Sequence, residues 1–163
     1  MNKILLLCLI SFVFSGRTVS QNGINLIKQF EGCILTAYKD PVGVWTIGYG
    51  TTNADKSITG TNIYSGLTIS QATAENWLKK SLDKKYGPLV NKYDSKYKWT
   101  QNEFDALISF AYNIGSIDQL TANGSRSRAT IANKMLEYVH AGGQVLPGLV
   151  RRRQAEHDLF VKH

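Results

Sequence analysis

Residues 30–50 read FEGCILTAYKDPVGVWTIGYG, and this stretch decides which fold the sequence predicts. Its Pro41–Gly43 turn lies between segments rich in aromatic and β-branched residues, which is typical of a β-hairpin. Apolar residues recur at helical spacing over residues 24–30, and Gly32 follows where a helix commonly ends. The sequence therefore predicts a short helix, with Asn22 as its N-cap, that leads directly into a β-hairpin.

Helical patterns dominate the rest of the chain. Residues 50–68 are rich in Gly, Thr, Asn and Ser, so we expect an irregular segment there with a third short strand. A helix is expected to begin at Ser70 and to stop at Gly87-Pro88, and another to begin at Thr100, which forms a capping box with Glu103. A third is expected over residues 131–139, closed by Gly142-Gly143, and a last one from about Pro147 to Val161. A helix, a hairpin and then helices alone predict an α+β fold in one domain.

Length and composition exclude several classes of protein. The chain has 163 residues, of which 43% are hydrophobic, enough for one core but not for a cofactor domain plus a second domain. Two cysteines are too few for a disulfide-rich scaffold. Because 19 Lys and Arg stand against 12 Asp and Glu, the formal net charge is +7. This charge suits a polyanionic partner such as nucleic acid, an anionic membrane or a bacterial cell wall, without choosing among them.

The first twenty residues carry the features of an export signal. Lys3 is followed by an apolar run over residues 4–14, which is short for a bilayer span of about 20 residues but fits a secretory signal. We expect residues 1–20 to be a signal peptide, cleaved after Ser15 or Ser20, and residues 21–163 to form the domain. A retained signal anchor and a buried first helix are the alternatives. The protein is expected to be secreted or periplasmic, or released from a membrane-tethered form, and to touch a membrane only transiently through this segment.

Glu31 and Asp40 are candidate catalytic groups because their surroundings differ. Glycoside hydrolysis usually needs one carboxylic acid, which protonates the leaving oxygen, and one ionised carboxylate. Glu31 lies at the expected helix C-terminus among apolar residues, and both the helix carbonyls and burial raise the pKa of a carboxyl group. Asp40 opens a Pro-Gly turn, where solvent and free backbone N–H groups favour the ionised form. The pair fits this division of roles, although a surface Glu and a turn-forming Asp would give the same pattern.

Thr46 is placed by the register of the hairpin. Pairing of Asp40 with Val44 and of Tyr38 with Thr46 puts Asp40 and Thr46 on one face of the sheet. A hydroxyl beside a carboxylate is suited to hold an attacking water. A register slip of one residue would turn Thr46 away from Asp40.

The chain closely resembles phage-type lysozymes, the glycoside hydrolase family 24 endolysins. A Glu, eight residues, an Asp, five residues and a Thr make up the catalytic spacing of that family, and Glu31, Asp40 and Thr46 meet it. The likeness rests, in order, on residues 30–32, 37–41, 43–50, 101–107, 110–115 and 147–156, and it covers roughly residues 22–162. The sequence departs from the family at Thr51, where His is frequent, and at Cys33, where Leu is common.

The resemblance implies a lysozyme-like α+β domain, with a small hairpin-containing lobe, a larger helical lobe and a cleft between them. It implies an inverting muramidase that hydrolyses the β-1,4 bond between N-acetylmuramic acid and N-acetylglucosamine. Glu31 would be the general acid, while Asp40, assisted by Thr46, would activate water on the opposite face of the sugar. One of Arg151, Arg152 and Arg153 would approach and orient Glu31, and the resemblance favours Arg152. Trp45 and Tyr38, both on the hairpin, are further candidates for contact with the sugar or support of the site.

Other readings of the same residues remain open. A chitin or chitosan hydrolase, a lytic transglycosylase and a non-catalytic wall-binding module are the alternatives to a muramidase. His140, His157 and His163 are scattered without ligand spacing, so neither a metal nor a cofactor is expected. We expect bacterial peptidoglycan rather than nucleic acid as the partner, and a monomer.

Overall fold

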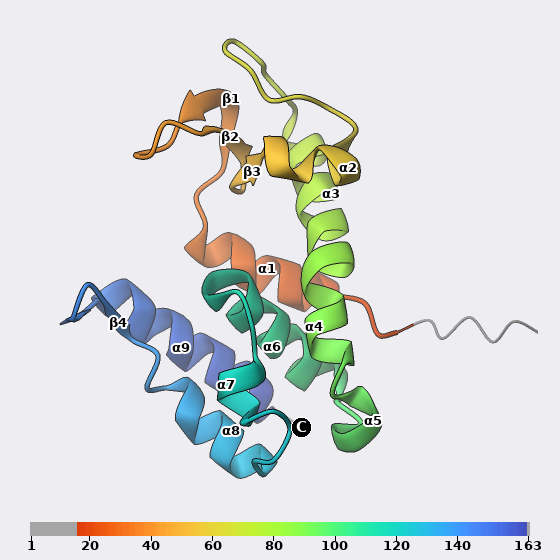
Figure 1. Ribbon diagram of the computed structural model, residues 1–163, viewed down its shortest axis with the longest axis vertical. Helices are drawn as coiled ribbons and strands as arrows, with labels where there is room; N and C mark the ends of the chain where they lie inside the picture. Colours follow the sequence, from red (N-terminus) through yellow and green to blue (C-terminus); the bar gives the residue numbers. More distant parts are fainter. Residues whose placement is uncertain (1–15, 163) are drawn as a thin grey trace, which may run out of the picture.

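The computed structural model describes residues 16–162, which form a small lobe around a β-sheet and a larger helical lobe (Figure 1). The small lobe contains the three-stranded sheet β1-β2-β3, the short helix η1 (Asn53–Asp55) and α2 (Lys56–Thr59). The predicted α+β class is confirmed. No helix within the described residues is both long enough and apolar enough to cross a membrane.

Helix α1 (Gln21–Phe30) crosses beneath the small lobe and ends at Glu31. The prediction that Asn22 caps this helix is wrong: Ser20 is the N-cap, and its side chain accepts the N–H of Asn22. Ser20 is the cap because Asp105, a buried residue of the helical lobe, accepts hydrogen bonds from both its backbone N–H and its hydroxyl. The helix then buries one apolar face against the core, with Ile27 fully buried.

The sheet has the register that the sequence predicts. Strand β1 (Ile34–Lys39) pairs antiparallel with β2 (Trp45–Gly48), and Tyr38 lies opposite Thr46. The N–H of Asp40 donates to the carbonyl of Val44 at 3.0 Å, so the hairpin closes as expected. The expected third strand is β3 (Thr51–Thr52), which pairs with β2.

A continuous helical rod joins the two lobes along one side of the molecule (Figure 1). It consists of α3 (Gln71–Ser81), the π-helical segment η2 (Leu82–Tyr86) and α4 (Gly87–Asn91). The prediction that Gly87-Pro88 stops the helix is therefore wrong. The N–H of Gly87 donates to the carbonyl of Leu82, five residues earlier, and Pro88 falls in the first turn of α4, where its missing N–H costs no helical bond.

The helical lobe is assembled around α6 (Gln101–Ile114), whose Phe104, Leu107, Ile108 and Phe110 are fully buried. The predicted capping box of Thr100 and Glu103 is present. Around α6 lie α5 (Asp94–Tyr97), α7 (Asp118–Thr121), α8 (Arg128–Met135) and α9 (Pro147–Phe160), the last of which agrees with its predicted range.

The predicted helix over residues 131–139 is too long, because α8 ends at Met135. Gly142 and Gly143 do not close a helix. They form the turn between β4 (His140–Ala141) and β5 (Gln144–Val145), and both have positive φ, which glycine adopts without strain.

Residues 16–20 are bound to the domain although the sequence places them in the signal. Val19 is buried, and its N–H donates to Asp83 at 2.9 Å. Thr18 accepts a hydrogen bond from Gln101, and Arg17 exchanges two hydrogen bonds with Asn91. The rest of the expected signal lies outside the described residues. These contacts favour processing after Ser15 over processing after Ser20, and the position of the cut stays a prediction.

A chain that begins at Gln21 should be less stable than one that begins at Gly16. It loses the Ser20 cap and the burial of Val19, and we expect its free energy of unfolding to fall by about 2–4 kcal/mol. Urea unfolding of the two chains measures the difference. Equal unfolding midpoints would show that residues 16–20 are not part of the stable domain.

Candidate active site

Glu31 lies where α1 ends, at the wall of a cavity. It is the C-cap of the helix, and its N–H donates to the carbonyl of Ile27 at 3.0 Å. The side chain is 27% exposed. The cavity measures about 440 Å³, and its lining includes Asn113 at the end of α6 together with Leu146 and Arg151 at the start of α9. A carboxyl group at this place is both accessible to a ligand and fixed by the helix end.

Arg152 holds the side chain of Glu31. Its Nη1 donates to Glu31 Oε1 at 2.5 Å, across a sequence separation of 121 residues. Arg152 itself is almost completely buried, and its Nη2 donates to the backbone carbonyl of Ser109 on α6. The structure therefore contains the contact between Arg152 and Glu31 that the family resemblance implies.

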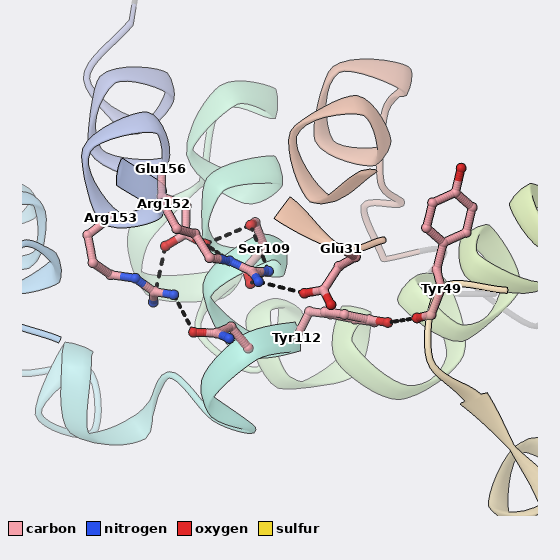
Figure 2. A network of polar contacts seen from close by, with 8 residues as sticks. Glu31, Tyr49, Ser109, Tyr112, Arg152, Arg153 and Glu156 are labelled. Atoms are coloured by element: carbon pink, nitrogen blue, oxygen red, sulfur yellow. Dashed lines mark hydrogen bonds and ion pairs between the residues drawn. The ribbon is translucent and has the colours of Figure 1, made fainter. Parts of the chain in front are cut away.

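Behind Arg152 lies a second, fully buried carboxyl group, that of Glu156 (Figure 2). Arg152 Nε donates to Glu156 Oε1 at 3.0 Å, and the hydroxyl of Ser109 donates to the same oxygen. Arg153 Nη1 lies 3.1 Å from Glu156 Oε2. Burial raises the pKa of Glu156, against the opposing effect of the two guanidinium groups, and burial lowers the pKa of Arg153.

Tyr112 lies near Glu31, and its side chain runs toward the backbone of Tyr49 (Figure 2). Its hydroxyl donates a hydrogen bond to the backbone carbonyl of Tyr49, just beyond strand β2. Burial raises the pKa of Tyr112, and the negative charge of Glu31 adds to the effect, so the hydroxyl keeps its proton.

Asp40 lies in the hairpin turn of the small lobe. Its Oδ1 accepts the N–H groups of Val42 and Val44, at 3.0 and 2.8 Å. These two hydrogen bonds fix the orientation of the Asp40 side chain within the turn. Oδ2 accepts no hydrogen bond from any residue of the described range 16–162, so one carboxylate oxygen remains for a ligand or a water.

Thr46 is buried on β2, opposite Tyr38. Its hydroxyl donates to the carbonyl of Val44 at 3.1 Å, not to Asp40. Because Thr46 follows Asp40 around the same turn, this bond stiffens the segment that also supplies the Val44 N–H to Asp40. Neither Asp40 nor Thr46 lines the cavity at Glu31.

The other two hairpin candidates differ in their surroundings. Trp45 packs beside the small cluster of Ile47, Ile63 and Trp77, and Lys39 Nζ lies 5.5 Å from the centre of its ring. Trp45 itself is partly buried. Tyr38 is half-buried on β1.

Sequence reasoning missed the residues that support Glu31 from behind. Tyr112 and Glu156 lie within segments that carry the family resemblance, and Ser109 lies between two such segments, but the catalytic spacing assigns none of them a role. A signal exists for one of them: Arg152 and Glu156 are four residues apart on α9, so that opposite charges share one helix face. Within residues 16–162, no group of three or more His, Cys, Asp or Glu side chains is placed to hold a metal ion.

Comparison with solved structures agrees with the lysozyme-like fold. The endolysin from Escherichia coli O157:H7 phage FAHEc1 is 34% identical with a TM-score of 0.71, over 89% of this chain and 94% of the other. The muramidase domain of SpmX from Asticaccaulis excentricus is 32% identical with a TM-score of 0.70, over 90% of this chain and all of the domain.

Similar sequences are phage endolysins. The endolysin of Lactococcus phage c2 is 48% identical over 147 residues, which cover 88% of this chain but 60% of the relative, so the chain spans well under the full length of that protein. The endolysin of Acyrthosiphon pisum secondary endosymbiont phage 1 is 34% identical over 87% of this chain and 97% of its own length. The family model described as phage lysozyme matches residues 28–156, which include Glu31, Asp40 and Thr46. This protein therefore belongs to the phage lysozyme family.

Proposed function

We propose that this chain is an N-acetylmuramidase that lyses bacterial peptidoglycan by hydrolysing the β-1,4 bond between N-acetylmuramic acid and N-acetylglucosamine. The observation that carries the proposal is the carboxyl group of Glu31, held by buried Arg152 at the wall of a 440 Å³ cavity. In Figure 1, the C-terminal end of α1, the β1–β2 hairpin with Asp40 and the turn beside β4 all lie toward the same side of the molecule. The relatives support the proposal, because they are named endolysin or muramidase.

Glu31 acts as the general acid that protonates the glycosidic oxygen. When the proton leaves, the resulting carboxylate already has the Arg152 guanidinium at 2.5 Å. The negative charge that develops on Glu31 during proton transfer therefore meets a cation that is already in place. Arg152 also prevents rotation of the side chain, so that the proton is presented from one direction.

Asp40 acts as the base on the opposite face of the sugar. The Val42 and Val44 N–H groups hold its Oδ1, which leaves Oδ2 to orient and deprotonate water. Thr46 stiffens the turn through its bond to Val44 and contributes its hydroxyl oxygen as an acceptor for the same water. A single displacement by water inverts the anomeric carbon, which requires carboxyl groups about 6.5–9.5 Å apart.

The alternatives differ in what they require of Asp40. A lytic transglycosylase needs no base for water and leaves a 1,6-anhydro end, whereas a chitin or chitosan hydrolase would use both carboxyl groups on another glycan. A wall-binding module would need neither group. The protein would act outside the cytoplasm as a monomer, without cofactor or nucleic acid.

Glu31→Gln should abolish turbidity clearing of bacterial cell walls while the fold remains. The amide keeps an oxygen for Arg152 but has no proton to donate, so we expect a loss of at least about 100-fold. Near-ultraviolet circular dichroism checks the fold. Clearing at the wild-type rate would remove Glu31 from the mechanism.

Asp40→Asn separates the catalytic role of Asp40 from its role in the turn. The amide oxygen still accepts the Val42 and Val44 N–H groups, but the base is lost, and we expect kcat to fall by about 10²–10⁴-fold. Mass spectrometry of the muropeptides released by the wild type identifies the cleaved bond and the product end. Anhydro ends together with a fully active Asp40→Asn variant would establish the transglycosylase instead.

Glu156→Gln should destabilise the protein, because it leaves Arg153 buried without a counter-charge and leaves Arg152 with Glu31 as its remaining partner. Loss of one partner of a buried ion pair costs about 3–5 kcal/mol. The control is Glu137→Gln, which removes an exposed partner of Lys134 and should cost less than about 1 kcal/mol. Urea unfolding compares the two variants. Equal losses would show that the Glu156 carboxyl is neutral in the folded protein.

A further inference from the structure

We propose that Tyr112 is a positioning residue, whose hydrogen bond to the Tyr49 carbonyl fixes the small lobe relative to Glu31. The inference rests on the proposed function, since Asp40 and Thr46 are carried by the small lobe and Glu31 by the end of α1. Tyr112 belongs to α6 in the helical lobe, and Tyr49 directly follows strand β2. This one hydrogen bond therefore joins the two groups of proposed catalytic residues.

The turn after β2 is shaped to offer this carbonyl. Gly48 and Gly50, on either side of Tyr49, have φ of +63° and +91°, a backbone conformation that favours glycine. A Cβ on Gly50 would lie 3.4 Å from the hydroxyl oxygen of Tyr112. The glycines thus let the backbone reverse while the Tyr49 carbonyl meets the helical lobe at close range.

Helix α6 supports both sides of the site from one face. Ser109 accepts Arg152 through its backbone carbonyl, and Arg152 holds Glu31. Tyr112 lies three residues further along, so its side chain shares a face of the helix with Ser109. The same helical turn therefore sets the position of Glu31 and that of strand β2.

The surroundings keep Tyr112 in place as a donor. Its ring packs against Tyr86 of η2, with ring centres 5.1 Å apart. Tyr112 lines a small cavity of about 30 Å³, whose lining also includes the ion pair of Asp55 and Lys85, at 2.7 Å. Because Tyr112 is buried here and stays protonated, its hydroxyl retains the hydrogen that the Tyr49 carbonyl accepts.

The other polar links near this junction do not replace the bond. Gln71 of α3 donates to the hydroxyl of Tyr49, and Lys28 of α1 pairs with Glu75 of α3. Both links run to the rod that joins the lobes. Among the residues described, the bond from Tyr112 is the hydrogen bond that connects the sheet backbone to α6.

Tyr112→Phe removes only the hydroxyl and is the test. Tyr97→Phe is its matched control, because the Tyr97 hydroxyl also donates to a backbone carbonyl, that of Arg126, at 2.7 Å within the helical lobe. Both variants should lower Tm by a similar few degrees. Only Tyr112→Phe should lower kcat, by about 10–100-fold, with KM within about twofold, since a shift of 1 Å between reacting groups can cost that much. Wild-type kcat in Tyr112→Phe, or an equal loss in both variants, would overturn the proposal.

A distance measurement tests, without substrate, whether the hydrogen bond of Tyr112 fixes the two lobes relative to each other. Spin labels at exposed Val42 and Val145, on the two hairpins, report the separation of the lobes in a full-length chain whose Cys8 and Cys33 are changed to serine. Tyr112→Phe should broaden the distance distribution, and Tyr97→Phe should leave it unchanged. A lower kcat with an unchanged distribution would overturn the proposal. Because the labels need no reaction, this result stands apart from the muropeptide analysis, which decides the proposed function.

Discussion

The ion network of Arg152 is the interaction on which the site depends. Its guanidinium is buried, and such a charge is stable only when it is paired and hydrogen-bonded. Glu156 behind it and Ser109 beside it supply these partners, and the remaining edge of the planar group faces Glu31. The packing of α6 against α9 thus fixes the position of the Arg152 guanidinium within the core. The remaining edge of this group holds the carboxyl group of Glu31 at the cavity wall.

Glu156 matters to Glu31 because it fixes the guanidinium that orients the Glu31 side chain. Arg152 Nε is held by Glu156 and its Nη2 by the Ser109 carbonyl, so its Nη1 approaches Glu31 Oε1 from a fixed direction. A guanidinium with Glu31 as its sole partner could follow that side chain as it moves, whereas one that is held from behind stays in place. Glu156 therefore contributes to the position of the Glu31 carboxyl group as directly as Arg152 does.

Local signals in the sequence predict the elements whose ends are set locally. The hairpin register follows from the Pro41–Gly43 turn, and the start of α6 follows from its capping box. One error arises where a distant residue decides, since Asp105 selects Ser20 as the cap of α1. Another arises from an uncommon local geometry, since a π-helical turn carries the rod through Pro88. The same distinction between local and distant contacts applies to the residues of the site. The spacing of Glu31, Asp40 and Thr46 is readable because one short segment holds all three, but the partners of Tyr112 and Glu156 lie 63 and 47 residues away along the chain.

The division of the proposed site between two lobes explains why these distant contacts matter. The position of Glu31 is set by Arg152 of the helical core. The position of Asp40 is set by its own hairpin turn, in which its Oδ1 accepts the N–H of Val44. Each carboxyl group is rigid within its lobe, so the distance between them depends on how the lobes are joined. The rod α3-η2-α4 contains a π-helical segment, and segments of this kind are among the places where helices kink. A rod of this kind does not set a spacing to within an ångström. That accuracy has to come from contacts at the junction itself, where Tyr49 is held at its carbonyl by α6 and at its hydroxyl by α3.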